Sequence, residues 1–283
     1  MTPKAKLRAL DIRRRFEALV SRPGEIINLA QAALLIAAEE ETHVDVAHYL
    51  ALLDELGRTG ASRVASNPGA GVEAFNDFLF EEKRFRGNQT QYYDPHNSFL
   101  HDVLDRRVGI PITLSIVYME VGARAGLETQ GIGMPGHFIV RAREAGSLEA
   151  SLIDPFNGRV IDREDCQARL DELFDGNVML SDEHLRSSGS RDILVRLLTN
   201  LKAIYTRASL YQKALATVER ILILKPEAVA EHRDRGALLA QIGRLPEAVW
   251  ATQLYLQLAP RSDDADEVKQ QLHVMQRRLA SRN

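Results

Sequence analysis

The sequence predicts an α+β fold with a helical N-terminal layer, a helix followed by a small antiparallel sheet, and helix pairs at the C-terminus. Three observations predict it. Apolar residues recur at helical spacing up to about residue 106, short runs rich in β-branched residues fill positions 129–161, and the C-terminal third contains a repeat of 34 residues. We expect two domains, residues 1–190 and residues 191–283.

The N-terminal layer is predicted from the spacing of its apolar residues. A first helix carries Leu7, Leu10, Ile12, Phe16 and Val20. A second helix is expected over residues 27–40 and a third from about Asp45. Gly57, Gly60 and the stretch 67–71 are expected to mark the end of this layer.

Two further helices complete the N-terminal part, one from Val72 and a short one over residues 99–106. The polar, turn-rich segment 86–97 lies between them and carries two adjacent tyrosines, Tyr92 and Tyr93. This composition indicates a loop.

The middle of the chain predicts one helix followed by strands. Pro111 suits the first turn of a helix and Gly126 suits its left-handed C-terminal cap, so residues 111–125 are expected to be helical. Short runs between Gly and Pro predict strands at residues 129–133, 137–143, 151–154 and 159–161. These runs lie too close together for helical crossovers, so the sheet is expected to be antiparallel.

The C-terminal region repeats with a period of 34 residues. A shift by that period superimposes Ala203 on Ala237, Ala214 on Ala248 and Pro226 on Pro260. Both copies have a break between two helices, at residues 208–209 and 242–243. This period, with small residues where paired helices cross, resembles the tetratricopeptide repeat. Residues 265–279 resemble the capping helix that such an array needs.

Composition and charge exclude several classes of protein. The 283 residues include 36 basic and 39 acidic side chains, so a net charge of −3 gives no long-range attraction to nucleic acid or an anionic membrane. The single cysteine, Cys166, rules out an intramolecular disulfide and any site built from several thiolates. No apolar run is long enough for a membrane span, and the N-terminus lacks an apolar signal core. We expect a cytoplasmic protein that binds neither nucleic acid nor membrane.

A histidine and an aspartate are the candidate chemical groups of the sheet. His137 opens one predicted strand and Asp154 ends a neighbouring one, so the two side chains can meet. A carboxylate in that position fixes the tautomer of the imidazole and raises its basicity. The missing partner of such a pair is a nucleophile, which we expect on the preceding helix.

Several longer segments carry a family resemblance, namely FLFEE at 78–82, FRGN at 85–88, YDPHNS at 93–98, GIPITLS at 109–115, PGHF at 135–138 and DPF at 154–156. Over residues 30–260 the chain resembles the bacterial SirB-type branch of the transglutaminase-like superfamily, which has a papain-like core. The resemblance implies a transglutaminase-like domain over residues 1–190, tetratricopeptide-like repeats over 191–283, and a related domain in a eukaryotic F-box protein. It also implies a triad of cysteine, histidine and aspartate, in which His137 and Asp154 match the last two members.

The nucleophile of that triad is missing from this chain. The resemblance places it in a Gly-x-Cys motif at the start of a helix, and counting back from Gly126 puts residues 109–111 at that place. Pro111 therefore stands at the position of the cysteine, and proline has no nucleophilic atom. This implies a degenerate core without thioester chemistry.

Two other side chains are alternative nucleophiles. Ser115 lies on the same helix face as Pro111, about 6 Å along the axis, unless its hydroxyl bonds back to a carbonyl one turn earlier. The acidic neighbours of Cys166 should raise its pKa and weaken it as a nucleophile, which indicates a free structural cysteine. Without a nucleophile, His137 and Asp154 are expected to form a hydrogen-bonded pair that clamps two strands.

The candidates for binding a partner are Tyr92, Tyr93, Asn97, Asn200, Arg207 and Arg235. The two tyrosines either line a groove beside the histidine, or one pins the loop and the other is exposed. The residues from the repeats would face a peptide or helix on a concave surface, unless the short array only packs as a helical extension.

Metal binding is a further possibility, because His96, His101, His137 and Asp154 are of the types that bind metals. Their spacing matches no zinc signature, so we expect no metal site and no cofactor.

The sequence thus predicts a non-catalytic, transglutaminase-like protein of regulatory type that binds a protein or peptide partner. The alternative is an amide or peptide hydrolase, or an acyl transferase, in which His137 and Asp154 act with Ser115.

Overall fold

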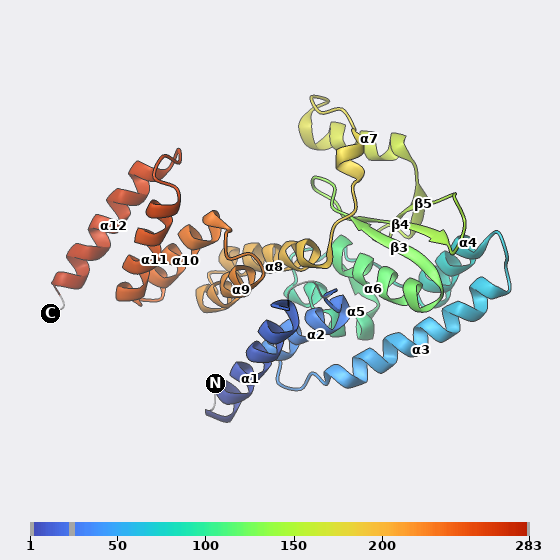
Figure 1. Cartoon of the computed structure of the whole chain (residues 1–283), viewed down its shortest axis with the longest axis horizontal. Helices are drawn as coiled ribbons and strands as arrows, with labels where there is room; N and C mark the ends of the chain where they lie inside the picture. The colour runs from blue at the N-terminus through green and yellow to red at the C-terminus, as the bar shows by residue number, and fades with distance from the viewer. Residues whose placement is uncertain (1–2, 23–25, 282–283) are drawn as a thin grey trace. The chain divides into compact units, whose positions relative to one another are not determined.

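The computed structural model describes residues 3–22 and 26–281, which form two compact units, one up to Leu194 and one from Val195 (Figure 1). The first unit combines helices with a four-stranded sheet, and the described part of the second consists of helices. The predicted α+β class is therefore confirmed. Among the described residues, no helix has the length and apolar character needed to cross a bilayer.

The N-terminal layer consists of α1 (Pro3–Val20), α2 (Leu29–Glu40) and α3 (Val46–Ala65). The side chains of Asn28 and Asp45 cap α2 and α3 by accepting hydrogen bonds from backbone N–H groups of the first turns. Nine of the twelve residues of α2 are buried, so this helix forms the centre of the layer.

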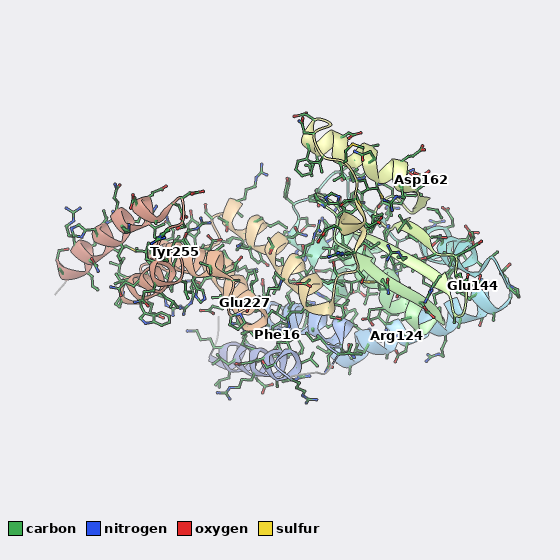
Figure 2. The ribbon with its side chains drawn as sticks, turned by 45° about the horizontal axis from the view of Figure 1, so that its top comes forward. Phe16, Arg124, Glu144, Asp162, Glu227 and Tyr255 are labelled. Carbon is green, nitrogen blue, oxygen red and sulfur yellow. The ribbon has the colours of Figure 1, made fainter. Side chains whose placement is uncertain are left out.

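The apolar residues predicted for α1 are only partly buried. Phe16, labelled in Figure 2, lies in the core with Ile12 and Val20. Leu7 and Leu10 are 69% and 58% exposed. At about 100° per residue, the two leucines fall on the side of the helix opposite Phe16. The predicted helix is therefore present, and three of its five apolar residues lie in the core.

Of the residues expected to mark the end of the layer, Gly57 and Gly60 lie within α3, and only the stretch 67–71 follows the end of this helix. Helix α3 runs through both glycines to Ala65, and both are buried. A Cβ atom at Gly57 would lie 2.3 Å from the Cβ of Arg124, so the missing side chain lets two helices approach closely.

Short elements join this layer to the centre of the unit. Helix α4 (Gly71–Asn76) continues as a π-helical turn, η1 (Asp77–Glu82). A 3₁₀ turn, η2 (Pro95–Ser98), precedes α5 (Leu100–Arg106). The strands β1 (Arg86–Gly87) and β2 (Val108–Gly109) pair in parallel, which the sequence did not predict.

Helix α6 is the central helix of the unit and spans Pro111–Arg124. Gly126 follows with a φ of +90°, as expected for a left-handed cap. Eleven of the fourteen residues of α6 are buried, and the helix packs against the strands β3 and β4 (Figure 1).

The sheet contains β3 (Leu127–Ile132), β4 (Ile139–Glu144), β5 (Ser151–Asp154) and β6 (Arg159–Ile161) in sequence order. All neighbouring strands are antiparallel, which confirms the prediction. Helix α7 (Arg163–Phe174) begins after the capping residue Asp162 (Figure 2) and is followed by a 3₁₀ turn, η3 (Asp182–Leu185). Helix α7 packs its buried residues with those of β3 and β4 in one apolar cluster.

The second unit is built from helix pairs. Helix α8 (Ser190–Arg207), within which the division of the units falls, precedes α9 (Tyr211–Leu224), α10 (Val229–Gln241), α11 (Leu245–Leu258) and α12 (Ala265–Ala280). The predicted breaks at 208–209 and 242–243 are confirmed. Ser209 and Gly243, which are 34 residues apart, both have a positive φ, so the two copies turn in the same way.

Candidate functional site

His137 and Asp154 meet as the sequence predicts. The strand that was expected to start at His137 starts two residues later, so His137 lies just before β4. Asp154 is the last residue of β5. Nε2 of His137 is 2.9 Å from Oδ1 of Asp154, and the two side chains are 3% and 2% exposed. Because β4 and β5 are neighbouring antiparallel strands, the sheet itself positions the pair.

The carboxylate of Asp154 is surrounded by donors. Nδ2 of Asn157 donates to Oδ2 at 2.7 Å, and the backbone N–H groups of Phe156 and Asn157 donate to Oδ1. Burial acts to raise the pKa of Asp154, but the hydrogen bonds from His137 and Asn157 outweigh it and hold the pKa below its ordinary value. The group is therefore an ionised carboxylate that orients the imidazole.

A hollow of about 400 Å³ opens beside this pair. It is lined by Gln89, Tyr92, Pro111, His137, Phe156 and Arg169, together with Gly136 and Asn157. Pro111, the first residue of α6, thus shares one hollow with His137. A second hollow of about 700 Å³ shares Gln89, Phe156 and Asn157 with the first, so the two adjoin.

Ser115 and Cys166 lie in the core, outside the lining of this hollow. The Ser115 hydroxyl is fully buried and donates to the carbonyl of Phe138 at 3.3 Å, not to a carbonyl of its own helix. Cys166 is on the first turns of α7 in the apolar cluster, where burial, and then Asp165 and Asp162, raise the pKa of its thiol. The raised pKa was expected, although burial is a larger cause than the acidic neighbours.

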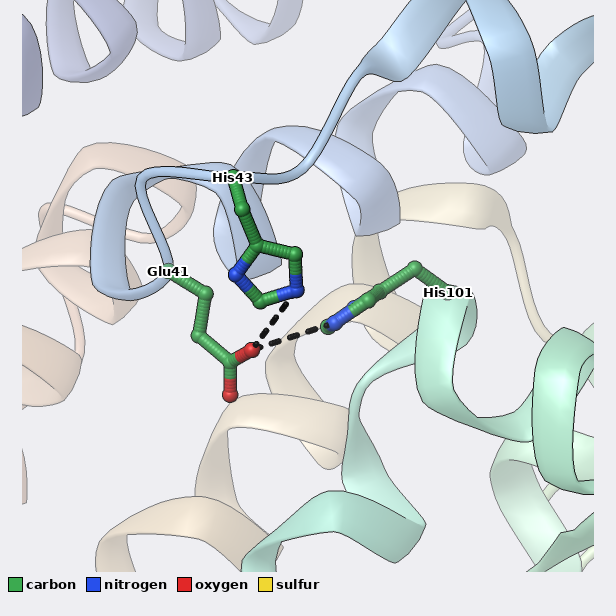
Figure 3. A group of neighbouring side chains, drawn as sticks. All are labelled: Glu41, His43 and His101. Atoms are coloured by element: carbon green, nitrogen blue, oxygen red, sulfur yellow. Dashed lines mark hydrogen bonds and ion pairs between the residues drawn. The ribbon is translucent and has the colours of Figure 1, made fainter.

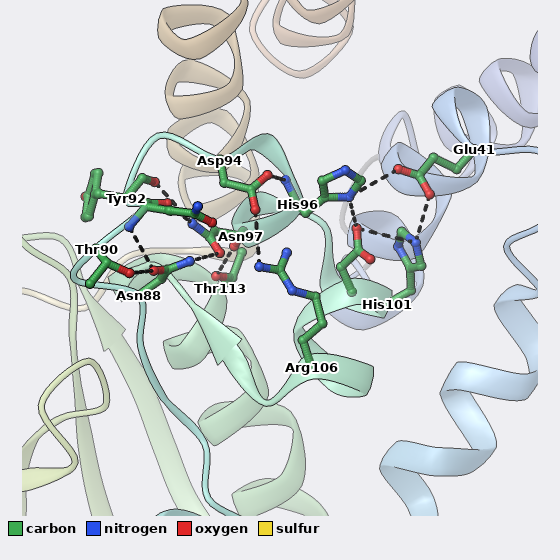
Figure 4. A network of polar contacts seen from close by, with 12 residues as sticks. Glu41, Asn88, Thr90, Tyr92, Asp94, His96, Asn97, His101, Arg106 and Thr113 are labelled. Carbon is green, nitrogen blue, oxygen red and sulfur yellow. Dashed lines mark hydrogen bonds and ion pairs between the residues drawn. The ribbon is translucent and has the colours of Figure 1, made fainter.

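Asn97 fixes the loop at the rim of the hollow (Figure 4). It is fully buried, accepts a hydrogen bond from Nδ2 of Asn88 at 3.0 Å, and donates to the carbonyls of Gln91 and Tyr92. The hydroxyl of Thr113 on α6 donates to the Asn97 carbonyl at 2.7 Å. Asn97 therefore contributes to the rim through the path of the loop.

The two tyrosines of this loop differ in position. Tyr92 is 38% exposed, lines the hollow and has its ring 6.2 Å from that of Phe156. Tyr93 is 59% exposed and packs edge-to-face on Tyr92, outside the lining.

Comparison with known proteins places the chain in a family. Residues 47–199 match the transglutaminase-like superfamily, and residues 201–273 match a tetratricopeptide repeat. A UPF0162 protein of Xylella fastidiosa is 34% identical over 262 residues, which cover 90% of this chain and 92% of that protein. The chain belongs to the UPF0162 family of transglutaminase-like proteins. The resemblance to a transglutaminase-like core with tetratricopeptide repeats is thereby confirmed.

Other relatives extend this comparison. A UPF0162 protein of Pseudomonas aeruginosa is 31% identical over 76% of this chain and 78% of its own length. F-box only protein 21 of Homo sapiens is 25% identical over 62% of this chain and 29% of that protein. The similarity to the F-box protein thus covers a part of each chain.

The repeat residues expected to bind a partner lie in different settings. Arg207 lines a hollow of about 500 Å³ between α8 and α10, together with Lys202 and Asp234. Arg235 lies over the ring of Trp250, 5.7 Å from its centroid. Asn200 is half-buried on α8. Of the three, only Arg207 is among the residues that line this hollow.

His96 and His101 form a polar cluster of their own, and neither lines the hollow beside His137 (Figure 4). They group with Glu41, His43 and Asp102, three residues that sequence reasoning missed. Glu41 and His101 are 60 positions apart in sequence, so no local spacing signals the cluster.

Proposed function

We propose that this UPF0162 chain uses its transglutaminase-like core to bind a protein segment and does not cleave it. The observation that carries the proposal is that Pro111 and His137 line the same hollow. The imidazole and its carboxylate are in place, and the position facing them at the start of α6 holds a side chain without a nucleophilic atom. A core of this kind keeps the recognition surface and lacks the attacking group.

The lining of the hollow suits a peptide. Tyr92 and Phe156 offer aromatic surface, and Gln89 and Asn157 offer amides that pair with a peptide backbone. The adjoining hollow adds Arg86 and Gly87 along the same rim. Together the two hollows give an extended segment several residues of contact.

The repeat unit supports a role in protein interaction. The hollow that contains Arg207 is lined by residues of α8 and α10, and a further hollow of about 510 Å³ is lined by residues of α10, α11 and α12, including Gln241. Tetratricopeptide-like arrays use such inner helix faces to hold peptides or helices. We propose that Arg207, with Asn200 and Arg235 nearby on the same helices, contacts the partner there.

The enzyme alternative receives no support from the position of Ser115. Its hydroxyl is buried and donates to the Phe138 carbonyl, so it is not directed at a substrate in the hollow. An activity-based fluorophosphonate probe tests this directly. We expect labelling of the full chain to be no higher than that of Ser115→Ala and His137→Ala variants, and labelling lost in both variants would establish the enzyme.

Photocrosslinking tests the binding proposal. A photoreactive phenylalanine analogue at position 92 lies in the lining of the hollow, whereas the same group at position 93 lies outside it. We expect position 92 to crosslink a discrete cellular protein and position 93 to crosslink it less. Gln89 is exposed and lines both hollows, so Gln89→Trp should fill them and abolish the crosslink. Equal crosslinking from 92 and 93, unaffected by Gln89→Trp, would exclude the hollow as the binding site.

A further inference from the structure

We propose that Glu41, His43 and His101 bind a divalent transition-metal ion of the zinc class. Glu41 follows the last residue of α2, His43 lies in the loop before α3, and His101 is on α5. Figure 3 shows the two imidazoles directed at one carboxylate oxygen. This cluster shares no residue with the lining of the His137 hollow.

The spacing of the ligand atoms fits coordination. Oε2 of Glu41 is 3.2 Å from Nε2 of His101 and 3.6 Å from Nε2 of His43, and all three ligand atoms lie within 4.8 Å of one another. In a tetrahedral site with bonds of 2.0–2.1 Å, ligand atoms are about 3.3–3.4 Å apart. An ion can therefore enter with small movements of the side chains.

The three ligand side chains differ in how exposed and how tightly packed they are, which suits a site that takes up its ion from solvent. His101 is 1% exposed and its ring packs against those of Tyr49 and Phe99, so its position is fixed. The side chain of Glu41 is 21% exposed, and that of His43 is 72% exposed. One buried imidazole thus presets the site, and the exposed one closes over the ion.

A neighbouring group, Glu41 with His96 and Asp102, is the competing site. Nδ1 of His96 already lies 2.7 Å from Oδ2 of Asp102, closer than two ligands of one tetrahedral ion would be. An ion there would have to break this hydrogen bond. Two imidazoles and one carboxylate are also the donor set that zinc takes in sites with an open fourth position.

The ion would join three segments that are separate in sequence. It links the end of α2 and the loop before α3 to α5, and it leaves one coordination position for water. The His96–Asp102 pair stands beside it, with Nδ1 of His96 3.7 Å from Oε1 of Glu41. That pair can hold Oε1 of Glu41 while Oε2 binds the ion.

Cobalt binding to the full, tag-free chain tests the site, because Co²⁺ replaces Zn²⁺ and gives visible absorption bands that depend on coordination. We expect one Co²⁺ per chain with bands of a tetrahedral or five-coordinate site, displaced by Zn²⁺. Glu41→Gln and His43→Ala should weaken binding by more than about tenfold. His48→Ala is the matched control, since His48 is an exposed histidine close in sequence and outside the cluster, and it should bind like the parent.

Two results would overturn the assignment. One is the absence of Co²⁺ binding by the parent chain beyond that of His43→Ala. The other is binding that survives His43→Ala but is lost in His96→Ala, which would assign the ion to the competing group. Because His43 and His96 are both exposed, circular dichroism should show that both variants fold.

Discussion

Gly57 of α3 faces Arg124 of α6 so closely that a Cβ atom at position 57 would lie 2.3 Å from the Cβ of Arg124. Arg124 is held in place by two carboxylates: its Nε is 2.7 Å from Oδ1 of Asp54 on α3, and its Nη1 is 2.6 Å from Oε2 of Glu120 on its own helix. The backbones of α3 and α6 therefore lie too close together to leave room for a side chain at position 57. Arg124 is the last residue of α6, and Pro111 is its first.

Gly57→Ala should destabilise the protein. Alanine favours a helix over glycine by about 1 kcal/mol, but forcing α3 and α6 apart costs about 1–3 kcal/mol. We expect a lower urea midpoint by fluorescence. Gly60→Ala is the comparison on the same helix, because its Cβ would meet Phe75 at 3.1 Å and needs a smaller shift. A Gly57→Ala variant more stable than the parent would contradict the close approach.

Asp154→Asn should lower the free energy of unfolding by about 1–3 kcal/mol at pH 7, because the amide NH2 replaces one of the two accepting oxygens. That NH2 then faces a donor, either Nδ2 of Asn157 or the N–H of Phe156. The folded pKa of Asp154 lies below its ordinary value of 3.8. Its contribution is therefore fully present above about pH 4 and is lost as the pH falls through the folded pKa.

Urea unfolding of the parent and Asp154→Asn from pH 7 to pH 3 measures this dependence, and the difference between them should narrow in acid. Asp77→Asn serves as control, since Asp77 is exposed. The difference in unfolding free energy between the parent and Asp77→Asn should stay small from pH 7 to pH 3. A gap between the parent and Asp154→Asn that is as wide at pH 3 as at pH 7 would rule out ionisation as its cause.

Pro111→Cys should create a reactive thiol. The first position of α6 places it at a helix N-terminus in the same hollow as His137, and both lower a thiol pKa from its usual value of about 8.5. We expect the pH profile of alkylation by iodoacetamide to shift down by about one unit or more, and to return when His137→Ala is added.

Thr90→Cys is the matched control for this variant, because Thr90 is exposed and lines only the adjoining hollow. Both cysteines are compared in a Cys166→Ala background. Identical profiles at positions 111 and 90 would mean that residue 111 does not occupy the nucleophile position.

Cys166 itself should be inert in the folded chain. It is 2% exposed, and burial together with Asp165 and Asp162 raises the pKa of its thiol. Titration with a chromogenic disulfide should find less than about a tenth of a thiol per chain at pH 8 in buffer and one in guanidinium chloride. Rapid reaction without denaturant would place the thiol at the surface.

The sequence predicts those features that depend on neighbouring residues. Pro111 and Gly126 bound α6 because each suits one end of a helix, and the 34-residue period locates the turns at Ser209 and Gly243. The meeting of His137 and Asp154 follows from strand order, since β4 and β5 are joined by a short connection.

Features that depend on contacts between distant segments were missed. In sequence, Gly57 looks like part of the end of the helical layer. In the structure it is a packing contact, because a side chain there would meet Arg124 on another helix. The parallel pairing of β1 with β2 and the grouping of Glu41 with His101 likewise join segments about 20 to 60 residues apart.

The amide of Asn97 should allow the side chains at the rim of the His137 hollow to vary in sequence without changing the loop that carries them. Its Nδ2 donates to the backbone carbonyls of positions 91 and 92, so these hydrogen bonds do not depend on which side chains those positions carry. Gln89, Thr90 and Tyr92 are exposed, so we expect them to accept other residues while the scaffold is retained. A library randomised at these outward-facing positions should yield folded proteins with new ligand preferences, and one randomised at Asn97 should yield mostly misfolded ones.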